Sequence, residues 1–263
     1  CTNFNQPLNN WNVSNVTNMN SMFSECTNFN QPLNNWNVSK VSNMSFMFHH
    51  CYVFNQSINN WNVSKVEDMS SMFYGCNEFN QSINNWNVSN VINMSSMFSE
   101  CTNFNQPLNN WNVSNVTNMD CMFSECTNFN QPLNNWNVSN VRHMTGMFNE
   151  CVQFNQPLNN WNVSNSTDIY DIFNNCIMNN NIQCFLMSMI GKSNVSAIYS
   201  LLNYMSIIKI YCLADDKNFV IENVIYEHYK KTLQNFIDNS MIDICKSCFM
   251  EKQCINAICG MCS

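Results

Sequence analysis

Apolar residues recur along the first two-thirds of the chain in a pattern that repeats every 25 residues. In the first copy, residues 10–14 alternate between polar residues and the apolar Trp11 and Val13, which is the two-residue period of a short β-strand. Over residues 16–29 the apolar side chains instead follow at steps of mostly three residues, which places them on one face of a short helix. Each unit is therefore predicted to contain one short strand and one short helix.

The unit is written seven times without an insertion or a deletion. Tryptophan and cysteine mark its phase, at Trp11, Trp36, Trp61, Trp86, Trp111, Trp136 and Trp161 and at Cys1, Cys26, Cys51, Cys76, Cys101, Cys126, Cys151 and Cys176. A fixed period of this length is typical of a solenoid, in which each coil buries its apolar face only by stacking on its neighbours. The strands are then expected to form a parallel sheet, with columns of apolar side chains behind it.

Three polar positions of the predicted strand are the same in every copy. They are Asn10, Asn12 and Ser14 in the first coil, and we expect them to form an outward-facing array of amide and hydroxyl groups. Stacked Asn side chains stabilise repetitive β-structure. The array is therefore interpreted as a device for solubility and register.

The composition changes near residue 176 and predicts two regions. Residues 1–176 form the repeat region. Residues 177–263 are predicted to be a helical C-terminal cap with a cysteine-rich end, beginning with the apolar segment 182–190. Such a cap is expected because the last coil of a stack must cover its free face with something other than another coil.

Charge and cysteine usage narrow the functional classes. The repeat region holds ten acidic residues against three basic ones and so carries the whole net charge of -7, which argues against nucleic acid as a partner. No apolar run approaches the ~20 residues that span a bilayer. Eight of the sixteen cysteines recur at one position of the repeat, where a buried, reduced thiol is the simplest interpretation. We therefore expect an intracellular, reducing compartment, with surface exposure as the alternative.

Aromatic and charged side chains gather at the variable positions of the second and third coils. The candidate partner-binding residues are Phe46, His49, His50, Tyr52 and Tyr74. Aromatic side chains mixed with charge are typical of protein interfaces. The alternative is drift at surface positions that nothing constrains.

The C-terminal end holds the candidate metal ligands Cys245, Cys248, Cys259 and Cys262. Two C-x-x-C pairs supply four thiolates, as a structural zinc site requires, while reduced cysteines facing a helical core are the alternative. No His stands in a recognisable relation to a nucleophile, and four glycines leave no phosphate-binding loop. The chain is therefore predicted not to be an enzyme.

The string F-N-Q-P-L-N-N-W-N-V-S-N-V-T-N-M-x-x-M-F, at residues 4–23 and 104–123, resembles the repeat of the BspA-like leucine-rich repeat surface proteins. That family occurs in mycoplasmas, other bacteria, protists and large DNA viruses. The resemblance implies an α/β repeat fold, a leucine-rich-repeat-like solenoid without catalytic residues, used for adhesion or for protein interactions. Heavy use of Asn, Ile and Met fits an AT-rich genome, such as that of a large DNA virus or a protist. If the source is a virus, the expected reducing compartment is the cytoplasm of the host cell.

These observations leave three functions open. The first is a non-enzymatic scaffold that binds another protein through the solenoid surface. The second is a secreted or surface-anchored adhesin. The third is an adaptor whose cysteine-rich end binds zinc and recruits cellular machinery such as a ubiquitin ligase.

Overall fold

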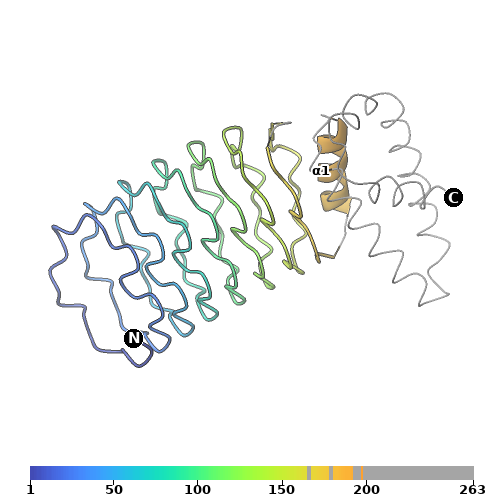
Figure 1. Cartoon of the computed structure of the whole chain (residues 1–263). Coiled ribbons are helices and arrows are strands. Elements are labelled where there is room, and N and C mark those ends of the chain that lie inside the picture. The colour runs from blue at the N-terminus through green and yellow to red at the C-terminus, as the bar shows by residue number, and fades with distance from the viewer. Residues whose placement is uncertain (165–166, 178–179, 192–196, 198–263) are drawn as a thin grey trace, which may run out of the picture. The chain divides into compact units, whose positions relative to one another are not determined.

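The computed structural model describes residues 1–164, 167–177, 180–191 and 197. The chain divides into two compact units, Cys1–Tyr204 and Met205–Ser263, and every described residue belongs to the first unit. In that unit the 25-residue coils lie side by side in the order of the sequence (Figure 1). Positions within a coil are counted below from its cysteine, so that Cys1 is position 1 and Glu25 is position 25 of the first coil.

A ladder of backbone hydrogen bonds joins neighbouring coils along positions 18 to 25. Position 18 forms isolated parallel bridges from coil to coil, from Asn18 with Asn43 through to His143 with Asp168. Beyond each bridge, the amides at positions 19, 21, 23 and 25 donate to carbonyls of the next coil, as from Met19 to Asn43 at 2.9 Å. We call positions 18 to 25 the ladder segment.

The ladder segment has an unusual backbone. Positions 21 and 25 adopt a left-handed conformation in all seven coils, with φ between 52° and 70°. The intervening amides close turns within the coil, as from position 22 to the carbonyl of position 19. With these two left-handed residues in the segment the backbone does not continue as a helix, and every second amide, at positions 19, 21, 23 and 25, donates to the neighbouring coil.

The secondary structure of a coil thus differs from the predicted strand and helix. Across residues 10–14 the structure has no strand, because the amides of Trp11 and Val16 close turns onto Leu8 and Val13 at 2.9 Å. The apolar steps of three residues belong to successive turns of this kind, not to a helix. Assignment to the leucine-rich-repeat-like class stays a prediction.

The interior consists of columns of equivalent side chains. Trp36 and Trp61 stack with ring centroids 6.5 Å apart and an interplanar angle of 4°, and each indole Nε1 donates to the position 8 carbonyl of the preceding coil. Trp36 is 3% exposed, whereas Trp11, which no described coil covers on its outer side, is 56% exposed. The positions that the hydrophobic pattern predicts to be buried are the ones that form these columns.

The coils are not parallel plates. Equivalent Phe rings at position 23 lie 5.4–5.8 Å apart, those at position 4 lie 5.8–6.2 Å apart, and the Trp rings lie 6.4–6.5 Å apart. Hydrogen-bonded strands are spaced by about 4.8 Å, so the ladder is the narrowest part of the stack. The stack of coils therefore bends with the ladder segment on its inner side.

All cysteines in the described part of the chain are free. The thiol of Cys51 donates to the carbonyl of Phe23 at 3.0 Å, and burial raises the pKa of Cys51 to about 12. A buried thiol with a raised pKa is a poor nucleophile, so the buried cysteines of the repeat act as small core residues.

One helix, α1 (Asn180–Gly191), covers the end of the seventh coil. The ring of Phe185 stands edge-on to Trp161, with centroids 6.1 Å apart, and edge-on to Phe173 at 5.8 Å. The side-chain amide of Asn181 donates to both the backbone and the side-chain oxygens of Asn155 at 3.1 Å. α1 therefore closes the aromatic columns where the repeat ends.

The left-handed backbone gives a prediction for Ser96, at position 21 of the fourth coil. The left-handed conformation costs a non-glycine residue about 1–2 kcal/mol. Glycine removes this cost, but it also makes the unfolded chain more flexible, which offsets part of the gain in stability. Ser96→Gly should raise the free energy of unfolding by about 0.5–1 kcal/mol in urea titrations. The neighbouring Ser95, which is not left-handed, is the control: Ser95→Gly should lower stability. Equal effects of the two substitutions would contradict the prediction.

Candidate functional site

The structure brings the five predicted partner-binding residues together. Phe46, His49 and His50 occupy positions 21, 24 and 25 of the second coil, and Tyr52 and Tyr74 occupy positions 2 and 24 of the third. We call these five residues the aromatic cluster. Other coils carry Ser, Thr or Asn at most of these positions, so the cluster lies on an otherwise small and polar surface of the ladder side.

His49 lies at the centre of the aromatic cluster. Its ring centroid is 4.2 Å from that of His50, 5.0 Å from that of Tyr74 and 5.5 Å from that of Phe46. His50 in turn lies 5.4 Å from Tyr52 and edge-on to Tyr74 at 5.1 Å. Phe46 and Tyr52 are 39% and 42% exposed, so the cluster presents two large rings supported by half-buried imidazoles.

The two imidazoles are incompletely satisfied. Nδ1 of His49 and Nδ1 of His50 are buried without a hydrogen-bond partner among the described residues. Burial, followed by the neighbouring His50, holds the pKa of His49 below its usual value. An unpaired buried nitrogen costs least when the imidazole is neutral, so the cluster favours an uncharged His49.

Tyr74 connects the aromatic cluster to an acidic row. Its hydroxyl donates to Oε1 of Glu100, and this bond is the main reason why the pKa of Tyr74 is raised to about 12. Glu100, Glu125 and Glu150 stand at position 25 of successive coils. Burial and then the two neighbouring carboxylates raise the pKa of Glu125. The surface beside the cluster is therefore negative.

Gly75 makes room for the cluster. It takes position 25 of the third coil, where a Cβ atom would lie 2.4 Å from Nδ1 of His50. The imidazole of His50 thus occupies the space that a side chain fills in other coils. Sequence analysis missed Gly75, although a glycine at a position otherwise held by Glu, His or Asn is a visible signal.

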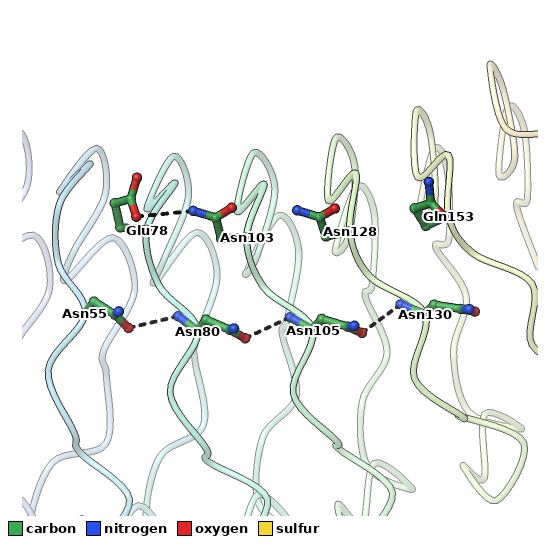
Figure 2. A pocket seen from close by; sticks show the side chains of 8 residues that line it. All are labelled: Asn55, Glu78, Asn80, Asn103, Asn105, Asn128, Asn130 and Gln153. Atoms are coloured by element: carbon green, nitrogen blue, oxygen red, sulfur yellow. Dashed lines mark hydrogen bonds between the residues drawn. The ribbon is translucent and has the colours of Figure 1, made fainter.

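A second candidate site, also missed from the sequence, is a shallow polar groove of about 640 Å³ beside the aromatic cluster. Two parallel rows of side chains line it: Asn55, Asn80, Asn105 and Asn130 at position 5, and Glu78, Asn103, Asn128 and Gln153 at position 3 (Figure 2). We call this the amide groove. Tyr52 and Val53 lie at the end of the groove that is formed by the third coil. The backbone amide of Glu78, which lines the groove, donates to the carbonyl of Tyr52 at 3.1 Å.

The amide groove owes its rows to hydrogen bonds between coils. Oδ1 of Asn80 accepts from the backbone amide of Asn105 and from Nε2 of Gln106, both at 3.0 Å. The same pair of bonds recurs at Asn55, Asn105 and Asn130. Both acceptor positions of each oxygen are filled, which fixes the orientation of the amide. An Asn ladder thus runs along position 5, whereas Asn12, predicted to serve register, accepts from Ser14 within its own coil.

No metal site is evident in the part of the chain that the structure describes. There, no three His, Cys, Asp or Glu side chains come together as metal ligands. The predicted zinc ligands Cys245, Cys248, Cys259 and Cys262 lie outside the described residues. Among the described helices, none has the length and apolarity to cross a membrane.

The fit between Gly75 and His50 predicts a selective effect. Gly75 and Gly146 are both left-handed, but a Cβ at Gly146 would meet nothing nearer than Cys121 Sγ at 3.4 Å. Gly75→Ala should therefore displace the His50 ring and shift its proton resonances and those of Tyr52 in NMR spectra. Gly146→Ala, with the same backbone penalty, should leave these resonances in place. Unchanged His50 signals in Gly75→Ala would disprove this packing.

The lowered pKa of His49 predicts a stability difference with pH. Below about pH 6.5 the unfolded chain binds a proton at this residue more readily than the folded protein does, so stability falls as the pH decreases. The carboxylates of Glu25 and Glu100 oppose the effect without cancelling it. Between about pH 7.5 and about pH 5, wild type should lose more thermal stability than His49→Ser. An equal loss in both proteins would contradict the prediction.

Comparison with known proteins places the chain in a family. A family model matches residues 1–85 and 68–185, which takes in all seven coils and the start of α1. No curated protein matches the chain. The two matches together cover well over half of the sequence, so the chain belongs to the repeat-containing family described as "Mycoplasma protein of unknown function, DUF285".

Proposed function

We propose that this protein is a non-enzymatic scaffold of the BspA-like leucine-rich repeat type, which binds another protein through the surface of its stacked coils. The observation that carries the proposal is the aromatic cluster. Two large rings, Phe46 and Tyr52, stand exposed on a surface where the equivalent residues of other coils are mostly small and polar. Exposed aromatic side chains supported from beneath are typical of the residues that dominate binding energy.

Rigidity of the coils supports the same function. The ladder segment ties every coil to the next through several backbone hydrogen bonds, and the cluster rests on it. A surface held in one conformation loses little entropy on binding, so more of the contact energy appears as affinity. The free, buried cysteines are compatible with the reducing compartment that we propose for the interaction.

The test is to replace four of the five residues of the aromatic cluster by the residues that other coils carry at the same positions. A variant carrying Phe46→Ser, His49→Ser, Tyr52→Thr and Tyr74→Ser takes each side chain from an equivalent position, which should preserve the fold. The control, Ile92→Thr, removes another exposed apolar side chain, 47% exposed, outside the cluster.

Each protein is used to capture partners from extracts of native host cells, with quantitative mass spectrometry as the readout. Proteins that bind wild type and the Ile92→Thr control should fall at least about tenfold with the cluster variant, because one central aromatic contact is worth about 2 kcal/mol or more. The same partners retained in the same amounts would refute the proposed function. Circular dichroism and thermal unfolding establish that the variant is folded.

A further inference from the structure

We propose that the amide groove binds an extended, basic polypeptide segment that runs along the stack of coils, with two of its residues to each coil. In this arrangement alternate main-chain carbonyls of the segment accept hydrogen bonds from the side-chain NH2 groups of Asn55, Asn80, Asn105 and Asn130. The inference deepens the proposed function, on which it rests, by naming the kind of partner and how it is held.

The first step is the direction of the four amides. Their Oδ1 atoms are occupied by the next coil, and their Nδ2 atoms have no acceptor among the described residues. Because the oxygen of each amide is held, its NH2 group cannot exchange places with it. The position 5 row is therefore a fixed line of hydrogen-bond donors, repeated once per coil.

The second step is the spacing of the row. The Phe rings at position 4, between the two rows in sequence, are 6.1 Å apart from Phe54 to Phe79 and 5.9 Å apart from Phe79 to Phe104. An extended chain advances about 3.2–3.4 Å per residue and turns every second carbonyl to the same side, so its carbonyls repeat at about 6.4–6.8 Å. A twisted strand is at the shorter end of that range. Over four coils, the carbonyls of such a segment therefore stay close enough to the Asn side chains for hydrogen bonds.

The third step is the opposite wall. Asn103 donates to Glu78 at 3.2 Å, while the amides of Asn128 and Gln153 have no hydrogen-bond partner among the described residues. Free amides both donate and accept, which suits the N–H and C=O groups that a strand directs to its other side. The groove therefore offers fixed donors on one side and adaptable polar groups on the other, as strand recognition through the main chain requires.

Charge decides the composition of the segment. The eight residues of the groove include Glu78 and no cation, and the acidic row of Glu100, Glu125 and Glu150 belongs to the same coils. The protein carries a net charge of -7. A segment with Lys or Arg at alternate positions is complementary to this surface, whereas an anionic polymer is repelled.

The amide groove continues into the aromatic cluster at the third coil. Val53 precedes Glu78 in the position 3 row, and Tyr52 is bonded through its carbonyl to the amide of Glu78. A segment in the groove that extends toward the second coil meets these exposed side chains. The cluster then anchors an apolar side chain of the partner, and the groove holds the main chain that follows it.

The test uses an isosteric pair of substitutions, Asn80→Asp with Asn105→Asp. Each Asp keeps the oxygen that accepts from the next coil and replaces the NH2 donor by a second acceptor. The control pair is Asn87→Asp with Asn112→Asp, which adds the same charge outside the groove. There too the Asn oxygen accepts a backbone amide, from Ser89 and from Ser114 at 3.2 Å.

The probe is a fluorescent peptide of about ten residues that alternates Lys and Thr, titrated with the full chain and followed by anisotropy. Wild type and the control pair should bind it, and the groove pair should bind about thirtyfold more weakly, since two hydrogen bonds of about 1 kcal/mol each are lost. Attraction of charges alone gives the opposite sign, because the groove pair is more negative. Unchanged or tighter binding by the groove pair therefore overturns the inference.

Two further outcomes have defined meanings. If wild type binds a soluble linear β-glucan and not the peptide, the inference is overturned, and the groove is a polysaccharide site. The cluster variant of the preceding section should still bind the Lys–Thr peptide, which has no apolar anchor. If wild type does not bind the peptide but still captures partners through the aromatic cluster, only the inference is overturned. If wild type binds the peptide but the cluster variant captures the same partners as wild type, only the proposed function is overturned.

Discussion

The structure depends on the ladder of backbone hydrogen bonds between coils along positions 18 to 25. This ladder exists because two residues in every coil are left-handed, which turns every second amide toward the neighbouring coil. The cost of that conformation, about 1–2 kcal/mol for each non-glycine residue, is met by bonds that a helix would have kept within the coil. The arrangement sets the distance between coils and places the same side chain of each copy against the same side chain of the next.

The aromatic columns and the bend of the stack follow from this spacing. Equivalent rings at positions 4 and 11 lie farther apart than hydrogen-bonded strands do, with 6.5 Å between Trp36 and Trp61, so the coils open away from the ladder. The columns are closed at one end by α1, whose Phe185 meets the last Trp edge-on because a helix cannot continue the repeat. Packing and hydrogen bonding thus agree on one geometry, which gives the rigid surface that the proposed partner binding requires.

Surface features arise where one copy departs from the others, or where all copies agree. The aromatic cluster is of the first kind: five substitutions in two neighbouring coils, with Gly75 leaving space for His50, create one contiguous patch. The amide groove is of the second kind, because an Asn at position 5 in each coil produces a line of oriented donors. Both features lie on consecutive coils and share the third one, so the proposed partner can contact both.

The sequence by itself determined the period, the phase and the set of buried positions, because a strict repeat of Trp, Phe, Val and Met leaves stacking as the only way to bury them. It also located the five residues of the aromatic cluster, since they break the repeat at neighbouring coils. Only the tertiary structure decided the backbone of the coil, where left-handed residues replace the predicted strand and helix; Ser21 and Glu25 carry no local signal for that conformation. The amide groove was likewise decided by the tertiary structure. The orientation of Asn80 depends on donors from a coil 25 residues away, and no local pattern encodes a bond between coils.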